Sequence, residues 1–131
     1  MKALYLDASA FVKTVMTEPE SDALRTFLAA GPGRRVSSAL LRTEAVRAVR
    51  HLGPVAVSTV REGLRDVDLV AIDDRILDAA GVLAPGALRT LDAIHVTTAL
   101  AIGDDLAEIV TYDERMVEAA RSLGLPTIAP R

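Results

Sequence analysis

The stretch ALYLDASAFVKTVM (residues 3–16) determines the fold, because it joins a strand pattern directly to a helix pattern. ALYLD predicts a short buried strand, and ASAFVKTVM predicts a helix that follows without a linker. Asp7 lies at the junction. A carboxylate at this position has two explanations. It caps the helix that begins at Ala8, or it belongs to a functional site at the end of the strand.

The same alternation continues along the chain. Further strands are expected at residues 34–38, 68–73, 108–113 and 126–130, and helices at 18–31, 39–53, 54–66, 74–83, 88–103 and 114–124. Strands separated by helices of this length predict a parallel sheet with helices on both faces. We therefore expect one α/β domain over residues 1–131, built as a three-layer sandwich around a five-stranded sheet.

The composition excludes several kinds of site. Half of the 131 residues are hydrophobic and a quarter are charged, as in a soluble globular protein. The absence of cysteine excludes a thiol nucleophile, a disulfide and a cysteine-ligated zinc. The net charge of −3 argues against a simple electrostatic nucleic-acid binder. With no long apolar segment, we expect a cytoplasmic protein without a membrane span.

Four acidic residues are expected at one edge of the sheet. Asp7 ends the first strand and Asp113 the fourth, and the carboxyl ends of parallel strands share one edge. Helices that run antiparallel to the strands begin at that edge. Asp92 lies in the first turn of one such helix, and Glu44 lies in the second turn of the helix expected over residues 39–53. The pattern therefore gathers four carboxylates on one rim.

Two of these acids have unusual surroundings. After Asp92, the helix carries no charged residue until Asp104. Glu44 falls on the apolar face of its helix, between Leu40 and Ala48. A buried carboxylate is costly unless it is hydrogen-bonded, paired or bound to a metal.

Structural explanations exist for each acid. Asp7 and Asp113 are suitable N-caps, and Asp92 suits the first turn of a helix. Glu44 has a possible ion pair with Arg47 or Arg115. His95, three residues after Asp92, is either a neutral core histidine or a side chain that reaches the site.

Four clustered carboxylates need a cation, because like charges raise one another's pKa. Oxygen ligands favour Mg²⁺ or Mn²⁺ over zinc, and the usual chemistry of such a site is phosphodiester hydrolysis. Ser9 and Thr111 are candidates to orient a ligand or a water through their hydroxyls.

The chain resembles PIN-domain ribonucleases, and particularly the VapC-type toxins of toxin–antitoxin pairs. The resemblance rests on YLDASAFVK, LLRTEAVRA, LRTLDAIHVTTAL and VTYDERMVEAARSLGL, which occur in the family's order over nearly the whole chain. It implies the strand order 3-2-1-4-5 and a catalytic Mg²⁺ or Mn²⁺ site formed by Asp7, Glu44, Asp92 and Asp113. Asp7 and Asp92 would be the most direct ligands. Met116 stands where some relatives carry a fifth carboxylate.

The resemblance also implies a function and partners. It implies an endoribonuclease toxin that is usually a homodimer and is inhibited by a cognate VapB-type antitoxin. Candidate RNA contacts on the rim are Arg42, Arg47, Arg50 and Arg89. Phe11, Phe27 and Leu28 belong either to the core or to a groove for the partner.

Two alternatives remain open at this point. One is a catalytically inactive PIN-like binding or scaffold protein. The other is a receiver-like signalling domain, which is disfavoured because the first strand ends in one acid and the fifth has no lysine.

Overall fold

The computed structural model describes residues 1–131 and contains one five-stranded sheet. Its strands are β1 (Ala3–Leu6), β2 (Arg34–Ser38), β3 (Asp68–Val70), β4 (Leu106–Val110) and β5 (Thr127–Ile128). They are arranged in the order β3-β2-β1-β4-β5, and every pairing is parallel. The expected fold class and strand order are therefore confirmed.

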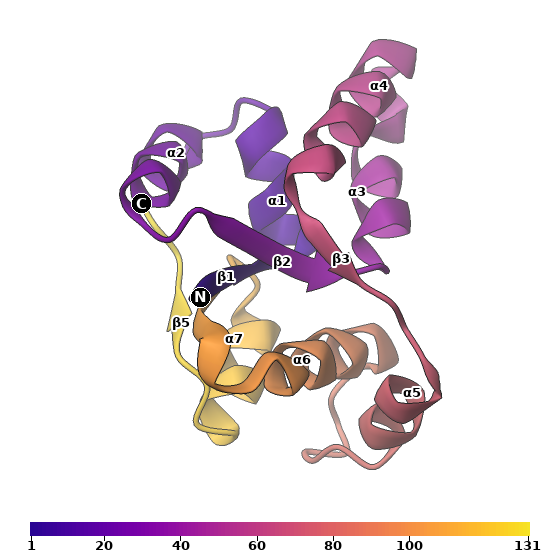
Figure 1. The fold of residues 1–131 in the computed structure, drawn as a ribbon. Coiled ribbons are helices and arrows are strands. Elements are labelled where there is room, and N and C mark those ends of the chain that lie inside the picture. Colours follow the sequence, from indigo (N-terminus) through magenta and orange to yellow (C-terminus); the bar gives the residue numbers. More distant parts are fainter.

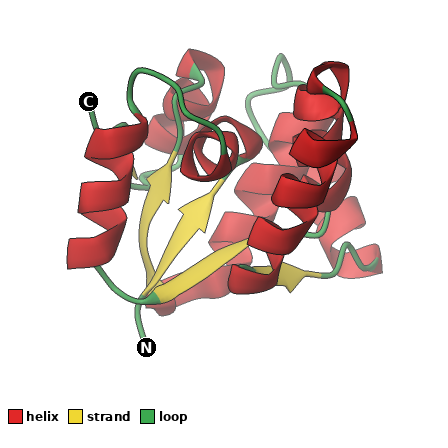
Figure 2. Cartoon of the chain, turned by 90° about the horizontal axis from the view of Figure 1, so that it is seen from above, coloured by secondary structure: helices red, strands yellow, loops and turns green.

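Seven α-helices surround the sheet. They are α1 (Ala8–Val15), α2 (Ser21–Ala30), α3 (Leu41–Val49), α4 (Pro54–Gly63), α5 (Asp74–Gly81), α6 (Thr90–Ile102) and α7 (Glu114–Ser122). Figure 1 shows α1 to α4 on one side of the sheet and α5 to α7 on the other. The view from above also shows helices flanking the strands on both sides (Figure 2). The molecule is a three-layer sandwich.

The central strand β1 packs against both helical layers. All four of its residues are buried, and successive side chains point to opposite faces of the sheet. Leu4 and Leu6 pack in one core cluster with Leu24 of α2. Tyr5 packs in another with Ala99 of α6. A strand that is buried on both faces positions whatever residue follows it, and here that residue is Asp7.

Several elements are shorter than the sequence predicts. The strand expected over residues 68–73 ends at Val70, because its partner β2 ends at Ser38 and the last hydrogen bond between these segments joins the Ala39 N–H to the Val70 carbonyl. The helix expected over residues 39–53 is α3, followed by a 3₁₀ turn over Arg50–Leu52. Glu44 therefore lies in the first turn of its helix, not the second.

The core accounts for most of the early apolar side chains. Phe11 and Leu28 are buried, and Phe27 is partly buried and packs against the same cluster as Leu28.

Asp73 caps α5 by accepting a hydrogen bond from the Ile76 N–H. No helix has both the length and the apolar character needed to cross a bilayer.

Candidate active site

The first acid, Asp7, connects the end of β1 to two neighbouring segments. Its Oδ1 accepts hydrogen bonds from the Ala10 N–H at 3.1 Å and the Ser9 hydroxyl at 2.6 Å. Its Oδ2 accepts a hydrogen bond from the Thr111 hydroxyl at 2.5 Å, just beyond β4. The Asp7 side chain thus caps α1, and it also binds across to the strand next to β1 in the sheet.

Burial dominates the electrostatics of Asp7, which is 5 % exposed. Loss of hydration raises the pKa of its carboxyl group, because the charged form is disfavoured away from water. The hydrogen bonds from Ser9, Thr111 and Ala10 oppose this effect by favouring the carboxylate. Burial is the larger influence, so a cation close to Asp7 would stabilise its ionised form.

Ser9 and Thr111 join the loop after β4 to this carboxylate. The Ser9 hydroxyl accepts a hydrogen bond from the Tyr112 N–H at 2.9 Å. The Thr111 hydroxyl accepts one from the Asp113 N–H at 3.1 Å. Each hydroxyl donates to Asp7 and accepts from the backbone. The end of β1 and the loop after β4 are therefore held at a fixed separation.

Arg89 bridges the second and third acids. Its Nε lies 3.0 Å from Asp92 Oδ2, and one of its terminal nitrogens lies 3.6 Å from Asp113 Oδ2. Asp92 is buried at the start of α6, whereas the Arg89 side chain is 57 % exposed. Asp113 also caps α7, because its Oδ1 accepts a hydrogen bond from the Arg115 N–H at 3.0 Å. A guanidinium cation therefore stands between two of the predicted metal ligands.

The fourth acid, Glu44, is bound by His95. His95 Nε2 lies 2.5 Å from Glu44 Oε1, and its Nδ1 lies 2.6 Å from the Tyr5 hydroxyl. Burial raises the pKa of Tyr5, so its hydroxyl stays protonated. The two ring nitrogens of His95 thus each have one hydrogen-bond partner, Tyr5 and Glu44.

His95 is therefore a core histidine, only 2 % exposed, that also contacts a predicted site residue. Glu44 forms no ion pair with Arg47 or Arg115, which were its alternative partners. Its carboxylate is oriented from α6, the same helix that carries Asp92.

The four acids lie at the carboxyl ends of β1 and β4 and at the starts of α3 and α6; Asp92 and Asp113 share Arg89, whereas Asp7 and Glu44 have other partners. Asp7 is joined to the segment of Asp113 through Thr111, and Asp113 is joined to Asp92 through Arg89. No group of three or more histidine, aspartate or glutamate side chains is arranged to hold a metal ion. The charges of Asp92 and Asp113 are balanced by the guanidinium of Arg89.

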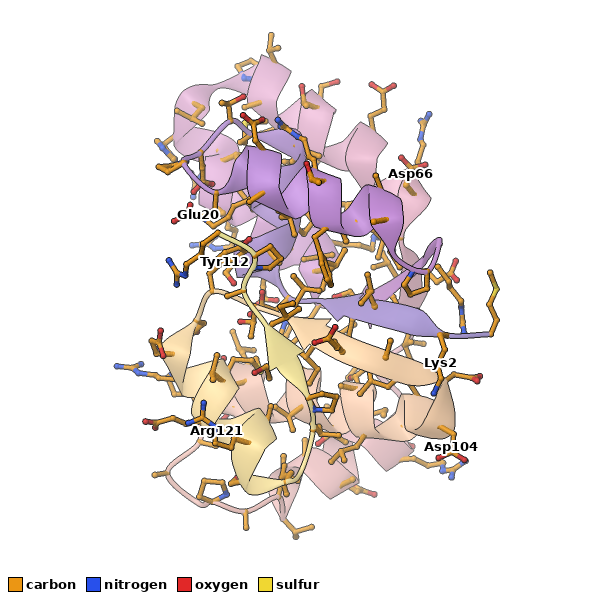
Figure 3. All side chains as sticks on the ribbon, turned by 90° about the vertical axis from the view of Figure 1, so that its left-hand side faces the viewer. Lys2, Glu20, Asp66, Asp104, Tyr112 and Arg121 are labelled. Carbon is orange, nitrogen blue, oxygen red and sulfur yellow. The ribbon has the colours of Figure 1, made fainter.

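Other charged residues lie at the opposite edge of the sheet. Lys2 donates a hydrogen bond to the Asp104 carbonyl there, and Figure 3 shows both residues far from Tyr112, which follows Thr111. Asp104 itself lies in an exposed 3₁₀ turn.

The sequence did not reveal two contributors to this edge, Tyr5 as a partner of His95 and Arg89 as a partner of the acids. The spacing of three residues between Arg89 and Asp92 was a usable signal. Met116, at the position of the fifth carboxylate of some relatives, is buried against Val96 and Ala119.

Comparison with known proteins identifies the class. The family model described as the PIN domain matches residues 4–122, and the chain therefore belongs to the PIN domain family. It is 52 % identical over 130 residues to Ribonuclease VapC46 of Mycobacterium tuberculosis, with 99 % of each protein covered. It is 41 % identical to Ribonuclease VapC35 of the same organism, with 97 % of this chain and 96 % of the relative covered. These identities place it among the VapC-type members of the family.

Solved structures share the fold at low sequence identity. VapC20 of Mycobacterium tuberculosis, a toxin that cleaves the sarcin–ricin loop, superposes with a TM-score of 0.78 at 14 % identity, over 97 % of this chain and 99 % of that one. A chain from a toxin–antitoxin complex of Klebsiella pneumoniae gives a TM-score of 0.74 at 20 % identity, over 99 % and 98 % of the two chains.

Proposed function

We propose that this chain is a metal-dependent endoribonuclease that hydrolyses RNA phosphodiester bonds at the site of Asp7, Glu44, Asp92 and Asp113. The observation that carries the proposal is the Arg89 bridge between Asp92 and Asp113, together with the link from Asp113 through Thr111 to the buried Asp7. Acids in this position need a positive charge beside them. Relatives of high identity over their full length are named ribonucleases.

The residues at this edge fit Mg²⁺ or Mn²⁺. The donors are carboxylate oxygens, which these hard cations prefer, and the chain contains no cysteine. In this proposal Asp7 and Asp92 are the most direct ligands, and Glu44 and Asp113 complete the site. When bound, the cation supplies an activated water and stabilises negative charge on the phosphate.

The surrounding residues have separate tasks in the proposal. Ser9 and Thr111 hold the Asp7 carboxylate through their hydroxyls. His95 holds Glu44 from within the core. Arg89 balances the charges of Asp92 and Asp113, and its exposed side chain would be able to turn towards the RNA if these acids held a cation.

The biological setting belongs to the same proposal. We infer a toxin of a toxin–antitoxin pair that acts on RNA in the cytoplasm as a homodimer and is held inactive by a cognate VapB-type antitoxin. The fold shared with the VapC20 toxin and with a chain of the Klebsiella pneumoniae complex supports this inference. Membership of the PIN domain family leaves no support for the receiver-like alternative.

The test is cleavage of structured cellular RNA by the purified protein, with Mg²⁺ or Mn²⁺ and with EDTA. Asp7→Asn is compared with Asp104→Asn, which removes the same charge at the opposite edge. Discrete fragments from the wild type and Asp104→Asn, only with metal, and none from a folded Asp7→Asn support the proposal. Equal cleavage by a folded Asp7→Asn refutes the site. If no RNA is cleaved and calorimetry detects no Mn²⁺ binding, the scaffold alternative is correct.

A further inference from the structure

A second feature lies beside the carboxylate edge, in a pocket of about 630 Å³ between α3, the end of α4 and β3. Three arginines line it, namely Arg42, Arg61 and Arg65. The remaining lining residues are Thr43 and the apolar Ala39, Leu64 and Leu69. We propose that this pocket binds phosphate groups of the RNA backbone. The proposal rests on the ribonuclease function proposed above and names a binding site for its substrate.

The charge of the pocket is opposite to that of the whole chain. The protein carries a net charge of −3, yet no acidic residue lines this pocket. None of the three arginines forms an ion pair within 4.0 Å, although nine such pairs occur in the structure. Like charges gathered without counter-charges repel one another, and an anion between them removes that cost.

The chemistry of the lining favours phosphate. An arginine guanidinium is a planar fork that matches two phosphate oxygens, and the Thr43 hydroxyl is a further donor. Leu64 and Leu69 form an apolar wall of the pocket, and the side chains of the three arginines are exposed, so an anion can reach them from solvent.

The pocket is also next to the proposed catalytic edge. Arg42 and Thr43 precede Glu44 in the first turn of α3. Ala39 follows the carboxyl end of β2, the strand beside β1. The pocket and Glu44 thus share the first turn of α3. A strand of RNA bound at Glu44 extends to this pocket within a few nucleotides.

A neighbouring hollow favours a polymer over a single anion. Arg61 and Arg65 also line a second pocket of about 500 Å³, together with Ser58 and Glu62. Glu62 forms no ion pair within 4.0 Å with either arginine. Two adjoining hollows that share two arginines match successive phosphates of one strand better than one isolated phosphate.

The experiment measures binding of a fluorescently labelled single-stranded RNA by anisotropy, in EDTA so that no cleavage occurs. The test variant is Arg61→Ala/Arg65→Ala. The control is Arg75→Ala/Arg121→Ala, which removes the same charge from two exposed arginines of α5 and α7 that form no ion pair. Circular dichroism melting confirms that both variants are folded.

We expect the test variant to bind RNA about tenfold more weakly than the control variant. The slope of log Kd against log salt concentration should fall by about 1.4, because two phosphate contacts to a single strand are lost. Equal affinities for the two variants would overturn the proposal. So would a test variant that keeps RNA binding but loses binding to an acidic peptide or antitoxin, since the pocket would then serve a protein partner.

Cleavage assays on the same proteins separate this proposal from the proposed function. If the wild type cleaves RNA with Mn²⁺ and the test variant binds and cleaves equally well, the ribonuclease stands and the phosphate pocket fails. If the wild type cleaves no RNA and binds no Mn²⁺ but the test variant alone loses RNA binding, the pocket stands and the ribonuclease fails.

Discussion

Removing Arg89 should tighten metal binding. In Arg89→Ala, Asp92 and Asp113 lose the cation that bridges them at 3.0 and 3.6 Å. A metal ion no longer has to displace a guanidinium before it binds both acids. Arg89 is the N-cap residue of α6 but its side chain makes no capping hydrogen bond, so the helix should persist in the variant.

The size of the effect follows from the exposure of the ion pairs. Each solvent-exposed ion pair contributes about 0.2–1 kcal/mol, and the Arg89 side chain is 57 % exposed. Two such pairs amount to about 1 kcal/mol, which corresponds to about a fivefold change in an equilibrium constant. We therefore expect the Kd for Mn²⁺ to fall about fivefold.

Isothermal titration of Mn²⁺ into the metal-free protein at neutral pH measures this change. Arg121→Ala is the matched control, because Arg121 lies in the last turn of α7, at the opposite end of that helix from Asp113. An unchanged or weaker affinity in Arg89→Ala would show that Arg89 does not compete with the metal. The same tightening in Arg121→Ala would show that only net charge matters.

Three further changes test the supports of the acids. Asp7→Asn should melt at a higher temperature than the wild type in metal-free buffer at neutral pH, because burial raises the folded-state pKa of Asp7 and so penalises its ionised form. A raised carboxyl pKa costs stability only at a pH above the pKa of Asp7 in the unfolded chain, so the advantage of the variant should shrink when calorimetry is repeated at lower pH. An equal or lower melting temperature at neutral pH would show that the hydrogen bonds to Asp7 outweigh its burial. Thr111→Val should cost about 1.5–3 kcal/mol in urea unfolding, because it removes a hydrogen bond to a charged group, and should raise the Asp7 pKa further, as followed by NMR titration. His95→Ala should cost about 2–4 kcal/mol, because it leaves a cavity and an unpaired Tyr5 hydroxyl, and a cost below about 1 kcal/mol would contradict the buried contact.

The sequence predicted the elements because their signals are local. The run at residues 3–16 has the periods of a strand and a helix, and Asp7 has the position of a cap, which the structure confirms. The order of the strands is not local information; it came from the family resemblance and agrees with the sheet.

The contacts of the acids were harder to predict. The Glu44–His95 hydrogen bond joins residues 51 positions apart, and it depends on how α3 and α6 meet across the sheet. Arg89 has several acids within reach of its long side chain, and only the folded geometry selects Asp92 and Asp113. The destabilisation of ionised Asp7 was also expected from neighbouring acids, whereas burial is its largest cause in the structure.

The hydrogen bond between Thr111 and Asp7 spans 104 positions of the chain. At a translation rate of about 5–20 residues per second, Asp7 is synthesised about 5–20 s before Thr111. During that interval β1 has no β4 beside it, and Asp7 cannot accept the hydrogen bond from Thr111. The contact between β1 and the loop after β4 should therefore form late, and chains interrupted before Thr111 should lack it however well their first helices fold.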